Sequence, residues 1–277
     1  MLPAHLISAP FESGSVCLVG AGPGDPGLLT LHALHALAQA DVVVHDALVS
    51  KEILSLAPQA RLEAAGKRAG GVRTPQLRIN QRLIALARQG LRVVRLKGGD
   101  PLIFGRGGEE AMALAAAAIR FRIIPGISAG IGGTAAAGIP LTHRGIARSV
   151  TFATGHDSSG GLTDLDWSAL GRGGEMLVLY MAGRQLGTIA TRLLAAGRKP
   201  DEAVAVIQDA TRAEQTVRVT TLAEAVDVPG ATRPTLIVIG PAVALRAQLS
   251  TWQQTTPMMT LISDQPLSGQ NKIRGRG

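Results

Sequence analysis

The sequence predicts a two-domain α/β protein with a mostly parallel first sheet flanked by helices and a mixed second sheet. Hydrophobic residues make up 46% of the 277 residues and aromatic residues only 3%, so the cores are expected to consist of small aliphatic side chains with helices close to strands. Short apolar runs alternate with helical periodicities from residue 16 to residue 137, which is typical of a parallel sheet covered on both faces. Beyond residue 146, two strand-like runs follow each other closely enough to predict a hairpin.

The first predicted domain, residues 14–138, begins with a buried strand at 16–19. This apolar run ends in the glycines and prolines of residues 20–27, which neither a helix nor a strand accommodates. Residues 28–39 then place apolar side chains at helical spacing. The same reasoning predicts strands at 41–46, 61–65, 92–96 and 122–124, and helices at 50–57, at 74–89 with Gly90 as the stop, at 107–118 and up to about 137.

The second predicted domain covers residues 146–250. Residues 138–144 interrupt the earlier alternation, so we expect the domain boundary there. Strands are predicted at 149–154, 176–180, 203–208, 215–220 and 235–239, with a helix at 184–196. Residues 1–13 and 251–277 have no periodic pattern, and we expect both ends of the chain to be disordered.

Composition excludes several classes of protein. The net charge is +8, but the arginines are scattered among hydrophobic segments and aromatics for base stacking are scarce, so nucleic-acid binding is disfavoured. No secretory signal and no run approaching the ~18 apolar residues of a membrane span is present, and we predict a cytoplasmic protein. Cys17 has no partner for a disulfide and is expected in the core. His45 has no second ligand at metal spacing, so no metal site is predicted.

The glycine-rich segment 20–25 follows the first strand, where a dinucleotide-binding loop would lie. The G-x-G-x-x-G spacing fails, because Asp25 stands at the sixth place and brings a negative charge to where phosphates would bind. Pro23 also removes an amide donor. Two interpretations of this segment remain, a tight structural turn and a loop shaped for a ligand other than a phosphate. We favour the second.

Residues 97–110 give the strongest local signal. Four glycines lie between positions 98 and 108, and the conformational entropy lost on folding is hard to explain in a plain connection. A bound ligand is the better explanation, with Asp100 at the strand's end placed to accept hydrogen bonds from a sugar hydroxyl or an amine. The alternative is a purely structural Gly-Asp-Pro turn.

Charged and sulfur-containing side chains follow several predicted strands. Asp46 and Lys67 are expected at one sheet edge, where they could serve as base and acid or form a solvated rim. Arg144 and Arg148 suit bidentate binding of carboxylates, although surface solubility explains them equally well. Met181 ends a strand, and is either a core residue or a contact for an adenine or sulfonium group.

Taken together, these segments resemble the tetrapyrrole methylase family across residues 16–249. Two stretches, R-L-K-G-G-D-P at 95–101 and G-I-P-L-T-H-R at 138–144, resemble the members that act on the earliest substrate. The other matching stretches are V-G-A-G-P-G-D-P-G-L-L-T-L at 19–31, A-D-V-V-V-H-D at 40–46, G-K-R-A-G at 66–70, L-I-F-G-R-G-G-E-E at 102–110, P-G-I-S-A at 125–129 and T-G-H at 154–156.

The resemblance implies a homodimer that binds S-adenosylmethionine between its two domains rather than along a Rossmann crevice. The implied activity is C-methylation of uroporphyrinogen III at C2 and C7, giving precorrin-2 by way of precorrin-1, for cobalamin or sirohaem biosynthesis. The carboxylates of that substrate would account for the basic excess and for the preference for arginine.

The resemblance also implies roles for individual residues. Asp46 matches the base and Lys67 the proton donor. The cofactor-binding positions are Pro23, Gly98, Gly99, Asp100, Ile103, Ser128, Ala129, Met181 and Ala210, and the substrate-binding positions are Arg106, His143, Arg144 and Arg148.

Two alternative functions remain open at this stage. The first keeps the fold and changes the substrate, which makes the chain a later precorrin C-methyltransferase. The second is a non-catalytic anion- or nucleic-acid-binding protein, which only the arginine content supports.

Overall fold

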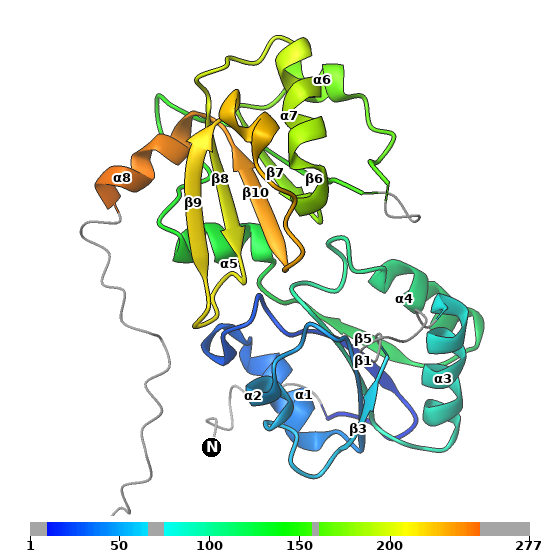
Figure 1. The fold of residues 1–277 in the computed structure, drawn as a ribbon. Helices are drawn as coiled ribbons and strands as arrows, with labels where there is room; N and C mark the ends of the chain where they lie inside the picture. Colours follow the sequence, from blue (N-terminus) through cyan, green and yellow to red (C-terminus); the bar gives the residue numbers. More distant parts are fainter. Residues whose placement is uncertain (1–9, 66–74, 157–160, 250–277) are drawn as a thin grey trace, which may run out of the picture.

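The computed structural model describes residues 10–65, 75–156 and 161–249 (Figure 1). The predicted disorder of 1–9 and 251–277 and the predicted acid Lys67 therefore lie outside the described residues. Within the predicted disordered leader, residues 10–13 are described, and Phe11 is buried in a core cluster.

The first sheet of the described chain is parallel, as predicted. Its five strands lie in the order β3-β2-β4-β1-β5. Their bounds are Val16–Gly20 for β1, Val42–His45 for β2, Arg61–Ala64 for β3, Val93–Lys97 for β4 and Phe121–Ile124 for β5. Because all five run the same way, the loops that follow β1, β2, β4 and β5 lie along one edge of the sheet.

Helices cover both faces of this sheet. Those on one face are α1 (Leu31–Gln39) and α2 (Lys51–Leu54), and those on the other are α3 (Gln76–Arg88) and α4 (Gly107–Ala116). The predicted start of the first helix at residue 28 is wrong, because residues 26–28 form a separate 3-10 turn and the hydroxyl of Thr30 caps α1 by accepting from Ala33 N.

The second sheet is mixed and has the order β6-β7-β10-β8-β9. Its strands are β6 (Val150–Thr154), β7 (Met176–Tyr180), β8 (Ala203–Gln208), β9 (Thr216–Thr221) and β10 (Thr235–Ile239). The predicted hairpin is confirmed, since β8 and β9 pair antiparallel. The strands β6, β7 and β8 point the same way, so their carboxyl ends also share one edge.

Two layers of helices enclose the second sheet. On one face lie α6 (Trp167–Arg172) and α7 (Leu186–Ala195), and on the other lies α5 (Ala129–Ala136). Although α5 precedes the predicted boundary at 138, it packs against β7 and β10 of the second sheet. The remaining helices are α8 (Arg246–Leu249) and the 3-10 helices η2 (Pro26–Leu28), η3 (Gly183–Gln185), η4 (Glu224–Asp227) and η5 (Pro241–Leu245).

No helix in the described part of the chain combines the length and the apolar content needed to cross a membrane.

Candidate functional site

The carboxyl edges of the two sheets meet. We call this region the inter-sheet junction. It comprises residues 21–30, 46–48, 98–106 and 125–133, which follow strands of the first sheet, and residues 155–156, 180–182 and 209–212, which follow strands of the second. Asp25 N donates to the hydroxyl of Thr211 over 3.1 Å, and the rings of Phe104 and Tyr180 lie 4.9 Å apart. The junction thus brings together loops that are far apart in the sequence.

The glycine-rich loops pack against each other without room for side chains. Gly22 and Gly99 exchange two backbone hydrogen bonds of 3.1 Å and 2.7 Å. A Cβ atom on Gly126 would lie 2.3 Å from the carbonyl oxygen of Gly99 and 2.7 Å from the Cα atom of Gly20. These glycines therefore allow the three loops to approach closely, which a larger residue would prevent.

Asp100 fastens two of these loops. Its Oδ1 accepts from Leu102 N over 2.8 Å and its Oδ2 accepts from Gly126 N over 3.1 Å. The structural reading of the Gly-Asp-Pro turn is therefore correct in part. Each carboxylate oxygen can still accept a second hydrogen bond, so the same group remains available to a ligand.

The amino-terminal half of α5 lies at the centre of the junction. Tyr180 OH contacts the Ser128 hydroxyl at 2.7 Å and accepts from Gly130 N over 2.8 Å, and burial raises the pKa of this tyrosine. Pro23 packs on Gly132, where a Cβ would lie 3.0 Å from its Cγ. A Cβ on the next glycine, Gly133, would lie 2.8 Å from the Cβ of Ala210.

The predicted cofactor-binding residues consequently fall on the loops and the helix that form the junction. Ile103 and Met181 expose their apolar side chains there. The others lie within the packed loops or at the start of α5: Pro23, Gly98, Gly99, Asp100, Ser128, Ala129 and Ala210.

Backbone strain is concentrated in the same place. Among the described residues, six that are not glycine have a positive φ, and five of them lie in the junction: Phe104 (51°), Arg106 (60°), Met181 (55°), Asp209 (45°) and Thr211 (64°). Such conformations cost on the order of 1–3 kcal/mol each and persist where the surrounding structure enforces them, often at functional sites.

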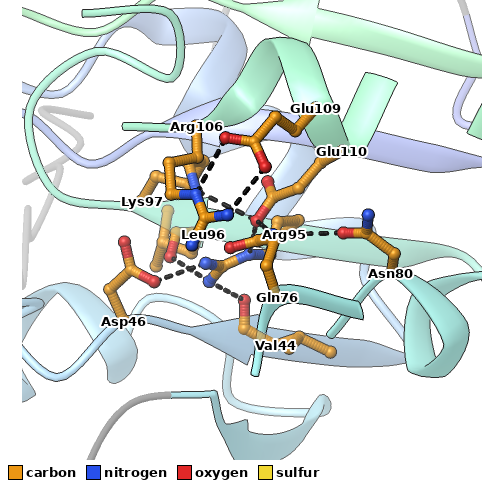
Figure 2. A network of polar contacts seen from close by, with 10 residues as sticks. All are labelled: Val44, Asp46, Gln76, Asn80, Arg95, Leu96, Lys97, Arg106, Glu109 and Glu110. Carbon is orange, nitrogen blue, oxygen red and sulfur yellow. Dashed lines mark hydrogen bonds and ion pairs between the residues drawn. The ribbon is translucent and has the colours of Figure 1, made fainter. Parts of the chain in front are cut away.

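A network of charged side chains connects Asp46 with Arg95 and Lys97 of β4 and with Glu110 of α4 (Figure 2). Arg95 Nη2 donates to Asp46 Oδ1 over 2.5 Å, and Arg95 Nε donates to Glu110 Oε1 over 3.0 Å. Lys97 Nζ also donates to Glu110 Oε1, over 3.1 Å. Burial, reinforced by the charge of Arg95, lowers the pKa of Lys97. Asp46 is thus the partly exposed end of a buried ionic chain.

The predicted substrate-binding residues lie in two different regions. Arg106 precedes α4 close to the Asp46 network and pairs with Glu109 at 2.7 Å (Figure 2). His143 and Arg144 are exposed in the connection after α5. Arg148 pairs with Glu175 at the amino-terminal end of β6, the end opposite to the junction. Of these four residues, Arg106 is the one whose charge interacts with Glu110 of the network.

Comparison with known proteins places this geometry in a family. A family model described as Tetrapyrrole (Corrin/Porphyrin) Methylases matches residues 15–226. The chain belongs to the tetrapyrrole methylase family. This tetrapyrrole methylase is 56% identical over 243 residues to a uroporphyrinogen-III C-methyltransferase of Sinorhizobium sp., covering 86% of this chain and 87% of that protein.

Other relatives of this tetrapyrrole methylase are longer. It is 52% identical over 245 residues to siroheme synthase 1 of Yersinia enterocolitica, covering 88% of this chain and 52% of that protein. The chain therefore spans about half the length of this relative.

Solved structures have the same architecture. Uroporphyrin-III C-methyl transferase from Thermus thermophilus, crystallised with S-adenyl homocysteine, matches with a TM-score of 0.73 at 37% identity, covering 83% of this chain and 99% of that one. A cobalt precorrin-4 methyltransferase matches at 24% identity with a TM-score of 0.72, which supports the fold alone.

Sequence reasoning missed three residues of the site in this tetrapyrrole methylase, namely Arg95, Lys97 and Glu110. The signal was present, because two cations at alternate positions of an otherwise apolar strand point to the same face and require a buried anion. The sequence did not single out Glu110, because it follows Glu109 in the first turn of a helix, where acidic residues are common at the surface.

Proposed function

We propose that this chain transfers methyl groups from S-adenosylmethionine to C2 and C7 of uroporphyrinogen III, forming precorrin-2 by way of precorrin-1. The observation that carries the proposal is the 56% identity to the Sinorhizobium enzyme over most of both chains. The inter-sheet junction supports the proposal, because Asp46, the glycine-rich loops and the start of α5 all lie at the carboxyl edge of the first sheet.

The residues of the junction suit the methyl donor. The exposed apolar side chains of Ile103 and Met181 offer surfaces for an adenine ring and a sulfonium group. The glycine-rich loops offer backbone groups and Asp100 carboxylate oxygens for the polar parts. We assign the donor to Pro23, Gly98, Gly99, Asp100, Ile103, Ser128, Ala129, Met181 and Ala210. When bound, S-adenosylmethionine supplies an electrophilic methyl group, and the protein contributes mainly alignment.

The catalytic assignments start from Asp46. Its carboxylate faces Arg95, and we assign it the removal of a proton from the methylated macrocycle. Lys67 is the assigned proton donor and lies outside the described residues. Arg106, His143, Arg144 and Arg148 are assigned to the substrate carboxylates, because a guanidinium binds a carboxylate through two parallel hydrogen bonds.

We further propose that the protein is a cytoplasmic homodimer whose product enters cobalamin or sirohaem synthesis. The longer siroheme synthases among its relatives support the second route. Light scattering of the purified protein tests the dimer, and a monomer would contradict it.

Counting the methyl groups added to the macrocycle tests the function directly. The purified protein is incubated without oxygen with uroporphyrinogen III and methyl-labelled S-adenosylmethionine, and the products are analysed by mass spectrometry. Two added methyl groups are expected for the native chain and a large loss of the product for Asp46→Asn. Asp201→Asn, an exposed change before β8 at the opposite edge of the second sheet, is the control and is expected to keep full activity.

No methyl transfer to uroporphyrinogen III by a protein that binds the methyl donor would contradict the proposed substrate. The assay would then be repeated with later precorrins.

A further inference from the structure

The central strand β4 carries two charged residues, Arg95 and Lys97, at buried positions that apolar residues usually occupy. Arg95 pairs in register with Leu18 on one side and with Val44 on the other, and both neighbours belong to the core beneath α3 and α4. Arg95 and Lys97 have side chains that are only 2% exposed. Charges at such positions are retained only when they are paired and hydrogen-bonded, and apolar residues are often equally stable there. Stability alone therefore does not explain them.

Arg95 joins a buried anion to a partly exposed one. Its Nε donates to Glu110 and its Nη2 donates to Asp46, whose side chain is 33% exposed. Its Nη1 donates to the carbonyl oxygens of Val44 and Leu96 over 3.3 Å and 3.4 Å. Four N–H groups of the guanidinium are engaged, so its plane is fixed and one oxygen of Asp46 is fixed with it.

Glu110 is the anchor of this arrangement. Its side chain is fully buried, and its Oε1 accepts from Arg95, from Lys97 and from Gln76 Nε2, the last over 3.0 Å (Figure 2). The position of Glu110 in the first turn of α4 favours a negative charge. This carboxylate therefore determines where the guanidinium of Arg95 can lie.

We infer that Glu110 and Arg95 are positioning residues for Asp46, an inference that rests on the proposed function of Asp46 as the base. Glu110 holds Arg95, and Arg95 holds Oδ1 of Asp46. Within the described part of the chain, Oδ2 of Asp46 has no hydrogen-bond partner, so it is the oxygen that takes the proton from the methylated macrocycle. Arg95 and Glu110 therefore act on the reaction through Asp46.

Charged groups of two neighbouring elements surround Asp46. Arg95 and Lys97 of β4 are its positively charged neighbours, and Glu110 of α4 is the carboxylate that pairs with both of them. His45 on its own strand contacts the Asp46 backbone oxygen, and the Arg106–Glu109 pair lies beyond the network. Glu110→Gln removes the charge that holds Arg95, and Arg95→Gln removes the group that holds Oδ1 of Asp46.

The test measures the carbon-13 chemical shift of the Asp46 carboxyl group at neutral pH and then the rate of methyl transfer. Aspartate carboxyl groups are labelled with carbon-13, and the Asp46 resonance is assigned by its loss in Asp46→Asn. For Glu110→Gln, the Asp46 resonance is expected to move and kcat to fall severalfold, while KM for S-adenosylmethionine stays unchanged, because Arg95 loses the carboxylate that holds it. Arg95→Gln should have the same effects and larger ones, because it removes the direct contact with Oδ1 of Asp46.

A matched control separates positioning from stability. Glu202 forms another largely buried pair with Arg198, in the second sheet's half of the molecule, so Glu202→Gln also removes a buried ion pair. This control should lower stability and leave the Asp46 resonance unchanged. If Arg95→Gln does not fold, Glu110→Gln decides the question alone.

An Asp46 resonance and a kcat that are the same in Glu110→Gln as in the native chain would overturn the inference. If the resonance moves as expected but the native chain adds no methyl group to uroporphyrinogen III, the network is supported and the proposed function fails. The two failures are therefore distinguishable.

Discussion

Gly126→Ala should disturb the junction because there is no space for a methyl group at this position. The new Cβ would lie 2.3 Å from the Gly99 carbonyl oxygen, so the backbone must move by about 1 Å to restore ordinary contact. Overpacking of this kind costs roughly 1–3 kcal/mol, and displacing the Gly126 N–H from Asp100 adds about 1 kcal/mol. We expect a loss of about 2–4 kcal/mol in the free energy of unfolding.

Urea denaturation measures this loss, and calorimetric titration with S-adenosylhomocysteine measures its effect on the assigned cofactor site. Gly108→Ala is the matched control, because a Cβ on Gly108 meets nothing within 4 Å and alanine favours the helix α4. The control should keep at least native stability and should keep native affinity. Equal stability and equal affinity in the two variants would refute the packing argument for the junction.

Three further predictions concern the rest of the first domain. Leu83→Ala removes a fully buried side chain of α3 and should cost about 2–5 kcal/mol in urea denaturation, whereas Leu77→Ala on the same helix, where the leucine is 67% exposed, should change stability by less than about 0.5 kcal/mol. Hydrogen bonds from Arg92 lower the pKa of Asp41, so this pair stabilises the fold above the unfolded pKa of about 4. Asp41→Asn should therefore cost about 1 kcal/mol in the free energy of unfolding at pH 7. The difference in stability between the native chain and Asp41→Asn should shrink as the pH falls below about 4. Burial raises the pKa of Cys17 to about 11, so a thiol reagent at pH 8 should leave the folded protein unmodified and react after unfolding; rapid labelling of the native chain would contradict this.

The regular elements of this fold are predictable because their signals are local. The apolar run that became β1 and the glycine that ends α3 both act through their immediate neighbours, and the structure places them within a residue of the prediction. The hairpin of β8 and β9 follows from the short distance between two strand-like runs. The wrong start of the first helix also has a local cause. Thr30 caps α1, but the leucine spacing from residue 28 onward predicted an earlier start.

The sequence reasoning missed α6 for a reason that is also local. Asp166 caps this short helix by accepting from Ala169 N over 2.9 Å, and Trp167 buries its ring in the core of the second sheet. Six residues are too few for a clear helical periodicity. The cap was visible in the sequence, but the burial of the tryptophan depends on contacts with α7.

The site itself depends on contacts that no single element determines. Thr211 and Phe104 both have a positive φ, which is unfavourable for a β-branched or aromatic residue. Each is held by the opposite half of the molecule, Thr211 by the backbone N–H of Asp25 and Phe104 by the ring of Tyr180. Because each strained loop is held by the other sheet, the shape of the junction exists only when the two carboxyl edges meet. Glycine spacing after β1 therefore could not distinguish this site from a dinucleotide-binding loop, and the distinction came from a charge, Asp25, rather than from the glycines.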